Sequence, residues 1–310
     1  MRYLTIFLLL LVLVAGFYVL APGPSAQALI RAGRLVAGLQ THTVRVQGLE
    51  ISYLQGGSGR VLLMIHGFGA DKDNWQRFAG FFTKHYLVIA PDLPGFGDSS
   101  NPADMRFDVE SQAARLAAFA DALGLAQMHV VGNSMGGQIA AVLAVRRPDL
   151  VASLALFDPL GVEQEPGVQP STTMRRLAAG ENMLLPRDRP AFDSMIGLMF
   201  YKVPWVPGAL ASHYATHWIR RMELHTRVFS DITGRYVPLM PLLPQLHVPT
   251  LVLWGADDEI LPAGGARVLA QGLANGTQVV IPECGHLPML EKPRETAAHY
   301  RAFLDALTAP

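Results

Sequence analysis

The sequence predicts an α/β fold in which a mostly parallel sheet is flanked by helices, carries a helical insertion and follows an N-terminal membrane-spanning helix. Three observations predict this architecture. An uncharged apolar segment opens the chain, short apolar runs then alternate with amphipathic segments, and this alternation is interrupted once, over residues 162–245. The 310 residues, half of them hydrophobic, are enough for one large domain with an insertion.

The opening segment, residues 4–21, contains no charged side chain. In a helix it would span about 27 Å, which matches the hydrocarbon core of a bilayer. We therefore expect an uncleaved transmembrane anchor over residues 1–22. The alternative is a cleaved signal peptide, because "AQA" at residues 26–28 resembles a cleavage site, although the apolar run is longer than is usual for such a peptide.

Residues 23–41 continue at helical period, with apolar side chains on one face and Arg31 and Arg34 offset from them. We expect a juxtamembrane amphipathic helix that either rests at the membrane interface or pairs with a second copy as a homodimer. The positive charges on the two sides of the apolar segment oppose each other, so they do not fix its orientation.

Charge and cysteine content exclude several classes of partner. The chain has 25 basic and 25 acidic residues and no basic run, so we expect no nucleic acid partner. The single cysteine, Cys284, excludes an internal disulfide and a cysteine-rich zinc site. We expect its thiol to be a small buried hydrophobic group.

Six short runs are almost wholly apolar, which predicts strands that are covered on both faces, as in a parallel sheet. These runs are residues 61–67, 86–93, 128–134, 152–158, 249–255 and 277–283. Residues 44–54 alternate with a period of two around Gly48 and predict an edge hairpin. The clearest helix begins after Asp108, a good N-cap, and ends at Gly124.

The interruption at residues 162–245 holds methionine-rich and aromatic stretches punctuated by proline, with no strand-like run. Ligands of open α/β sheets bind at the carboxyl ends of the strands, so we expect this helical insertion to form a cap or lid there. The sheet-forming core would then comprise residues 42–161 and 246–310.

The motif "GNSMG", residues 132–136, fits G-x-S-x-G at a predicted junction between a strand and a helix. Small residues two positions either side of Ser134 allow the close approach of strand and helix that such a turn requires. The turn would expose the serine hydroxyl above the sheet and direct the N–H groups of the helix N-terminus at an oxyanion. We therefore expect Ser134 to be a nucleophile.

A serine hydroxyl needs a base, and the base needs an orienting acid, in the chain order serine, acid, histidine. His286 follows the last predicted strand, and "GADD" offers both Asp257 and Asp258 after the strand before it. The N–H of Met135, directly after the nucleophile, is one expected oxyanion donor. The other is the N–H of Phe68 in "HGFGAD".

The motifs "HGFGADKDNW", "PDLPGFGDSS", "GNSMGG", "PTLVLWGADD" and "CGHLPMLEKP" together resemble those of the α/β-hydrolase superfamily. They are most similar to bacterial membrane-anchored lipolytic esterases and phospholipases A, and to monoacylglycerol lipase-like hydrolases. The resemblance implies hydrolysis of carboxylic esters by a triad of Ser134, Asp258 and His286, with no metal or cofactor. It also implies that Asp258, four residues past the tryptophan, is the acid.

The substrate implied is an acyl lipid (a phospholipid, lysophospholipid or monoacylglycerol), with a fatty acid as product. We expect an apolar site for its chain, since each buried methylene contributes about 0.8 kcal/mol. The candidate lining residues are His66, Leu160, Met195, Met199, Phe200, Trp205 and Leu287. For the cap residues among them, packing in the cap core is the alternative. The resemblance places the protein in a bacterial inner membrane as a single-pass protein, with its catalytic domain on the periplasmic side.

Two other functions stay open at this point. One is a hydrolase that breaks carbon–carbon bonds in aromatic ring-cleavage products, which can also carry "GNSMGG". The other is a non-catalytic receptor for a lipid or hormone on a hydrolase fold, which an intact triad disfavours. His213, His217 and His225 have helical spacing, but no further ligand at suitable spacing suggests a metal, and we expect a polar helix face.

Overall fold

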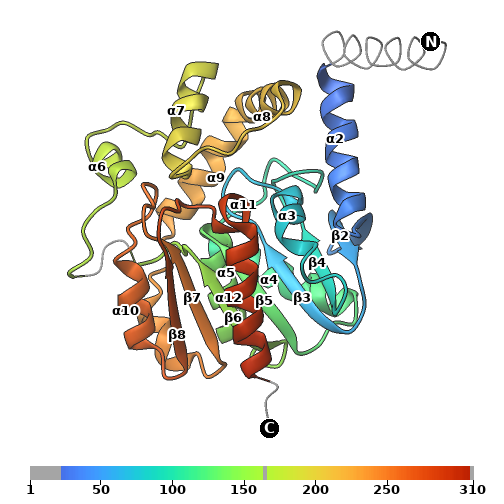
Figure 1. The fold of residues 1–310 in the computed structure, drawn as a ribbon, viewed down its shortest axis with the longest axis vertical. Coiled ribbons are helices and arrows are strands. Elements are labelled where there is room, and N and C mark those ends of the chain that lie inside the picture. The colour runs from blue at the N-terminus through green and yellow to red at the C-terminus, as the bar shows by residue number, and fades with distance from the viewer. Residues whose placement is uncertain (1–21, 163–165, 308–310) are drawn as a thin grey trace, which may run out of the picture.

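The computed structural model describes residues 22–162 and 166–307. Its centre is an eight-stranded sheet with the strand order β1-β2-β4-β3-β5-β6-β7-β8 (Figure 1). The β1–β2 and β2–β4 pairs are antiparallel, and all other neighbours are parallel. The strands are β1 (Gln40–Val46), β2 (Leu49–Gly56), β3 (Arg60–Ile65), β4 (Tyr86–Pro91), β5 (Met128–Asn133), β6 (Val151–Phe157), β7 (Thr250–Gly255) and β8 (Gly276–Ile281).

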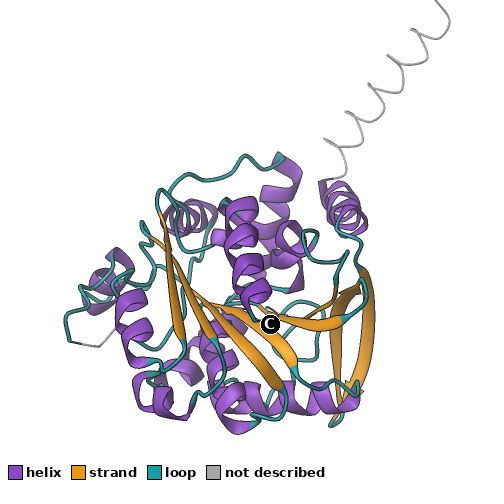
Figure 2. Ribbon diagram, turned by 60° about the horizontal axis from the view of Figure 1, so that its bottom comes forward, coloured by secondary structure: helices purple, strands orange, loops and turns teal. Residues whose placement is uncertain are grey.

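Helices cover both faces of this sheet (Figure 2). The described helices are α2 (Pro22–Val36), α3 (Gln76–Ala79), α4 (Val109–Ala122), α5 (Met135–Arg146), α6 (Thr172–Ala178), α7 (Arg189–Met199), α8 (Gly208–Arg220), α9 (Met222–Gly234), α10 (Gly265–Gly272), α11 (Pro288–Glu291) and α12 (Pro293–Ala306), with short 3-10 helices η1 (Lys72–Trp75) and η2 (Met240–Gln245). In β3, Leu63 and Ile65 face the core that includes α4, α5 and α10, whereas Leu62 and Met64 face the core that includes α3, α11 and α12. This double burial explains the continuous apolar run.

The strand predictions for the six apolar runs are confirmed to within two residues at each end. The predicted edge hairpin is also present, but its first strand begins earlier, at Gln40. Asp108 caps α4 by accepting the N–H of Ser111 at 2.9 Å. The expectation of two covered faces is wrong for β8, because this strand is at the sheet edge and Val280 is 42% exposed.

Between β6 and β7 the described chain contains α6 to α9 and η2 and no strand. Helices α7 and α8 lie beyond the carboxyl ends of the parallel strands (Figure 1). Helix α8 packs against α7 on one side and along α2 on the other. The helical insertion therefore contacts the segment that follows the N-terminal residues.

Helix α2 ends at Val36, five residues before the boundary expected from the sequence. The cause is a turn at Gly38, whose left-handed φ of 71° leads the chain into β1. Arg34 of this helix donates to both carboxylate oxygens of Asp73, at 2.7 and 2.6 Å, and Ile30 is buried. One face of α2 is thus fixed to the rest of the protein.

The expected transmembrane anchor, residues 1–22, lies outside the described residues except for Pro22. Among the helices of residues 22–162 and 166–307, none has both the length and the hydropathy needed to cross a bilayer.

Candidate active site

Ser134 occupies the turn between β5 and α5 with φ 56° and ψ −123°, a conformation that L-residues rarely adopt. Two glycines make this turn possible. A Cβ on Gly132 would lie 2.2 Å from the carbonyl oxygen of Gly136, and a Cβ on Gly136 would lie 2.3 Å from that of Ile65. The strand-to-helix turn expected from the sequence is therefore present, with its serine half-buried at the start of α5.

The loop after β3 approaches this serine from the neighbouring strand. A Cβ on Gly67 would lie 3.1 Å from the Cβ of Ser134, so Phe68, the next residue, is close to the turn. Met135 is the first residue of α5, where N–H groups have no acceptor within the helix and carry partial positive charge. The two residues expected as oxyanion donors thus belong to a loop and a helix N-terminus that meet at Ser134.

His66 lies inside the protein, with no exposed surface, and holds this loop in place. Its Nε2 accepts the N–H of Leu93 at 3.0 Å, so the proton is on Nδ1, which donates to the carbonyl oxygen of Gly67 at 2.8 Å. Burial lowers the pKa of His66, which keeps the ring neutral. We therefore assign His66 a positioning role in place of the substrate contact expected from the sequence.

Asp258 and His286 form a buried hydrogen-bonded pair at the ends of β7 and β8. The Nδ1 of His286 donates to Oδ2 of Asp258 at 2.7 Å. The same oxygen accepts the indole N–H of Trp254 at 3.0 Å, and Oδ1 accepts the N–H groups of Ile260 and Leu261 at 2.8 and 3.0 Å. Four donors match a carboxylate that acts only as an acceptor. Of the two candidate acids, Asp258 is the one that contacts the histidine.

The backbone of His286 is tied to the serine turn and to the helical insertion. Asn133, directly before Ser134, donates from Nδ2 to the His286 carbonyl oxygen at 3.1 Å and to that of Phe157 at 3.2 Å. The N–H of His286 donates to the carbonyl oxygen of Met199 at 2.9 Å. No role was expected for Asn133 from the sequence, although its place inside the serine motif is a usable signal.

Glu291 of α11 provides a second tie. Its Oε2 accepts the N–H of Gly285 at 2.8 Å and that of Tyr201 at 3.2 Å, and its Oε1 accepts the N–H of Lys202 at 2.7 Å. We call residues 282–287, between β8 and α11, the histidine loop. One carboxylate therefore joins this loop to the segment that follows α7. Glu291 and Tyr201 are 90 positions apart, so no local feature of the sequence predicts their contact.

Asp158 was also missed by the sequence analysis. It directly follows β6 with φ 46°, is fully buried, and accepts the N–H of Gly255 at 2.8 Å through Oδ1. One oxygen of Asp158, one of Asp258 and one ring nitrogen of His286 all lie within 4.8 Å of one another. Burial, followed by the nearby Asp258, raises the pKa of Asp158 well above its ordinary value.

The residues expected to line the substrate site have different surroundings. Leu287 is buried beside His286, Leu160 is partly buried and donates its N–H to the Ser134 carbonyl oxygen at 3.1 Å, and Met199 and Phe200 are partly buried. Met195 is fully buried in the packing between α7 and α8, which is the core alternative. Trp205 is 87% exposed, so the expectation that it lines the site is wrong.

The helical histidines named in the sequence analysis and Cys284 have surroundings of their own. His225 is buried against Phe68 and Trp218, and burial lowers its pKa to about 4, so the expectation of a polar face is wrong for this residue. His213 and His217 stack with centroids 6.1 Å apart. Cys284 is buried as expected, and burial raises the pKa of its thiol.

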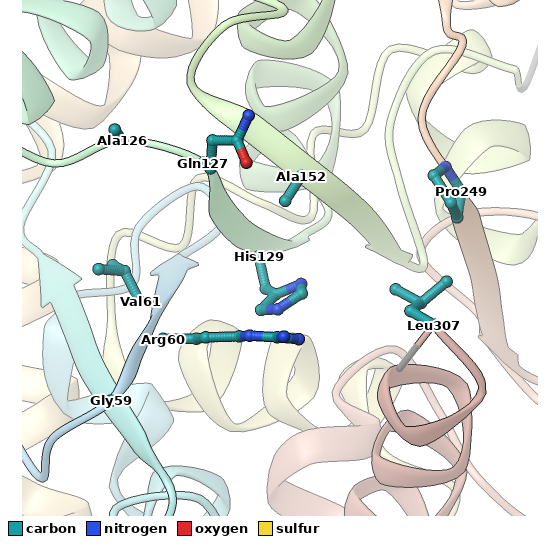
Figure 3. A pocket seen from close by; sticks show the side chains of 9 residues that line it. All are labelled: Gly59, Arg60, Val61, Ala126, Gln127, His129, Ala152, Pro249 and Leu307. Carbon is teal, nitrogen blue, oxygen red and sulfur yellow. The ribbon is translucent and has the colours of Figure 1, made fainter. Parts of the chain in front are cut away.

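A hollow of about 580 Å³ lies at the opposite edge of the sheet, at the amino ends of β3, β5 and β7 (Figure 3). Arg60 lies flat beside the ring of His129 there, and Pro249 and Leu307 lie across from them. Ligands of this fold class bind at the carboxyl ends of the strands, so we assign no site to this hollow.

Comparison with known proteins supports the geometry of the fold. The model of the alpha/beta hydrolase family matches residues 62–299. The chain belongs to the alpha/beta hydrolase family. It is 33% identical to Lipase 1 of Psychrobacter immobilis over 290 residues, which are 92% of this chain and 90% of that one. It is 30% identical to monoacylglycerol lipase ABHD6 of Homo sapiens over 283 residues, 87% and 84% of the two chains.

A solved structure agrees over the full length of this alpha/beta hydrolase. The crystal structure of a membrane phospholipase A, described as a novel bacterial virulence factor, superposes with a TM-score of 0.91 at 42% identity. The match covers 100% of this chain and 99% of that one. The similarity to lipases, to a monoacylglycerol lipase and to a phospholipase A shows that the protein is a carboxylic ester hydrolase.

The strain at Ser134 predicts an unusual order of stabilities. Changing alanine to glycine at an ordinary site lowers the free energy of unfolding by about 0.4–1 kcal/mol. At a strained positive φ, however, an L-residue itself lowers it by about 1–3 kcal/mol, and glycine removes this strain. We therefore expect Ser134→Gly to unfold at a higher temperature than Ser134→Ala, measured by thermal unfolding of the full chain. Ala114→Gly on the exposed face of α4 should show the ordinary loss. A less stable Ser134→Gly would contradict the strained turn.

Removal of the Glu291 carboxylate should loosen the histidine loop. Each charge-assisted hydrogen bond contributes about 1.5–3 kcal/mol, and Glu291→Ala loses three. We expect kcat/KM for a soluble ester to fall about tenfold or more, with partial recovery in Glu291→Gln. Glu295→Ala, which removes an exposed ion pair on α12, should have little effect. Equal activities in the two alanine variants would rule out this positioning role.

Proposed function

We propose that the protein is a membrane-anchored serine hydrolase that cleaves carboxylic esters of acyl lipids through Ser134, His286 and Asp258. The observation that carries the proposal is the pairing of Asp258 with His286 at 2.7 Å in a loop that Asn133 ties to the strained serine turn. A buried histidine that is oriented by an acid, on a loop bonded to the residue before a half-buried serine in a strained turn, supports activation of that serine.

The reaction follows from this arrangement. His286 accepts the proton of Ser134, whose oxygen attacks the ester carbonyl carbon. The N–H groups of Phe68 and Met135 donate to the resulting oxyanion, each contributing roughly 3–4 kcal/mol to its stability. Asp258 holds the imidazole and stabilises its charged form. His286 then protonates the leaving alcohol, and a water activated by the same base releases the acid from Ser134.

The lipid class is supported by the relatives, since those reported above are named a lipase, a monoacylglycerol lipase and a membrane phospholipase A. These names favour ester hydrolysis over cleavage of carbon–carbon bonds. The substrate in this proposal is a phospholipid, lysophospholipid or monoacylglycerol, and the product is a fatty acid. Apolar residues near His286, among them the buried Leu287 and the partly buried Met199, suit an acyl chain.

Membrane attachment completes the proposal. The uncharged residues 4–21 serve as a single-pass anchor, with the catalytic part on the periplasmic side of a bacterial inner membrane. The exposed Leu35 and Val36 at the end of α2 support pairing of two copies along this helix.

We expect a fluorophosphonate probe to label wild-type protein in isolated membranes at Ser134, as shown by peptide mapping, and to leave Ser134→Ala unlabelled. Wild-type protein should cleave medium-chain and long-chain acyl glycerols or lysophospholipids faster than acetyl esters, because each added methylene is buried. Activity that falls steadily from acetyl upward would contradict the lipid assignment. Labelling at another residue would contradict the nucleophile.

A further inference from the structure

The segment that joins α7 to α8 presents an apolar surface to solvent. Its exposed large side chains are Tyr201 (53%), Val203 (49%), Trp205 (87%) and Val206 (38%). They are four of the nine large hydrophobic residues that are exposed in the described chain, and they fall within six consecutive positions. Single exposed apolar residues are ordinary, but such a cluster marks contact with an apolar partner. We call residues 200–207 the apolar strap.

The backbone of the apolar strap is fixed at both ends. Glu291 accepts the N–H groups of Tyr201 and Lys202, and Pro207 forms the N-cap of α8. Pro204 and Pro207 restrict φ between these points. The apolar side chains are therefore held outward by a defined backbone.

The apolar strap is continuous with a helix that packs against α2. Helix α8 begins directly after the strap and packs along α2, which starts at Pro22. Helices α7 and α8 and the amino-terminal end of α2 share one end of the molecule (Figures 1 and 2). An anchor that ends at Pro22 therefore brings a bilayer to the side of the strap.

The composition of the apolar strap suits the surface of a bilayer. Tryptophan and tyrosine prefer the membrane–water interface, and the exposed Lys202 can reach lipid phosphates. We propose that the apolar strap docks the catalytic part on the lipid bilayer, with Trp205 inserted at the level of the headgroups. This inference rests on the membrane anchoring proposed above.

Tryptophan fluorescence tests the docking directly. Of the four tryptophans, Trp75 and Trp254 are fully buried and Trp218 is 9% exposed, so lipid can reach mainly Trp205. The full chain is reconstituted in phosphatidylcholine vesicles with and without brominated acyl chains, which quench at short range. We expect brominated lipid to lower the emission of wild-type protein and to leave that of Trp205→Phe unchanged.

Activity gives a second readout. Trp205→Ser should lower kcat/KM for a long-chain lysophospholipid in vesicles roughly tenfold while a soluble butyrate ester is cleaved at the wild-type rate. Val280→Ser removes an exposed apolar side chain from the edge of β8 and should change neither rate.

The outcomes separate this proposal from the hydrolase proposal. In one outcome the protein is membrane-bound and is labelled by the fluorophosphonate, but brominated lipid does not quench Trp205. That outcome overturns the docking and leaves the hydrolase assignment intact. Protein absent from the membrane fraction overturns both anchoring and docking. A disulfide between two copies of the Trp205→Cys variant, together with a lack of quenching of wild-type Trp205 by brominated lipid, would show that the strap contacts a second copy of the chain. That result would overturn the docking.

A second inference concerns Asp158 and rests on a different observation. Its Oδ2 is buried, accepts no N–H in the described residues, and lies within reach of the Asp258–His286 pair, with the Asp258 carboxylate as its one polar neighbour for a shared proton. The other titratable groups that face it, apart from the Asp258–His286 pair, are the Glu291 carboxyl and the Cys284 thiol, and neither of these can carry a positive charge. Two adjacent buried carboxyls share one negative charge.

The hydrogen bonds decide where that charge resides. Four N–H groups donate to Asp258, whereas Asp158 accepts one, so Asp158 holds the proton. We propose that Asp158 is a reserve acid, neutral in the wild type, that ionises and orients His286 when the Asp258 carboxylate is lost. Its role is positioning, since it acts on substrate only through His286.

The double-mutant cycle tests this role. Replacing a triad aspartate with asparagine typically lowers kcat about 10⁴-fold. We expect Asp258→Asn to lose about 10²-fold, Asp158→Asn alone less than about threefold, and the double variant about 10⁴-fold. The exposed Asp257→Asn is the matched control and should resemble the wild type. A double variant equal to Asp258→Asn would overturn the reserve role.

Stability against pH tests the protonation of Asp158 separately. Unfolding frees this carboxyl to lose its proton above its ordinary pKa, so the wild type should lose thermal stability relative to Asp158→Asn as the pH rises from about 4 to about 8. A constant difference between their melting temperatures would show that Asp158 is ionised in the folded state and would overturn the proposal.

Discussion

The close approach of β3, β5 and α5 at the carboxyl edge of the sheet is the constraint on which the rest of the structure depends. Gly132 and Gly136 allow backbone atoms to approach where any side chain would overlap them. That approach fixes Ser134 at a positive φ and keeps its side chain out of the helix that follows. The folding energy of the apolar strands on either side, buried on both faces, offsets the strain of this single residue.

The acid and the histidine are positioned mainly through backbone hydrogen bonds. Asp258 is held by two main-chain N–H groups and an indole, and the loop of His286 is held by Asn133 and Glu291. Such bonds have fixed directions and lose little side-chain entropy, because the partners already belong to ordered turns. A loop without regular structure can thereby carry a group whose placement must be accurate to a fraction of an ångström.

Much of this fold could be predicted from local sequence, for identifiable reasons. Strands buried on both faces give continuous apolar runs, and the serine motif carries its own steric signature in its glycines. Contacts between distant segments leave no such trace, which is why the roles of Asp158 and Glu291 were missed. The sequence overestimated the burial of Trp205. An apolar side chain in the insertion predicts an apolar neighbour, but the sequence does not tell whether that neighbour is the protein core, the substrate or a membrane.

The apolar strap and the histidine loop are hydrogen-bonded to the same carboxylate, that of Glu291. A movement of the strap on contact with lipid can therefore be transmitted to His286. The strap begins where Met199 accepts the N–H of His286, and Glu291 binds Lys202 and the histidine loop with one carboxylate. A displacement of the strap would strain these bonds and, through them, the loop that carries the imidazole. An interface that orders Trp205 would therefore also order His286, and a hydrolase built this way gains activity where its substrate is concentrated. This link needs no separate lid, because the chain that would contact the bilayer is the chain that holds the base.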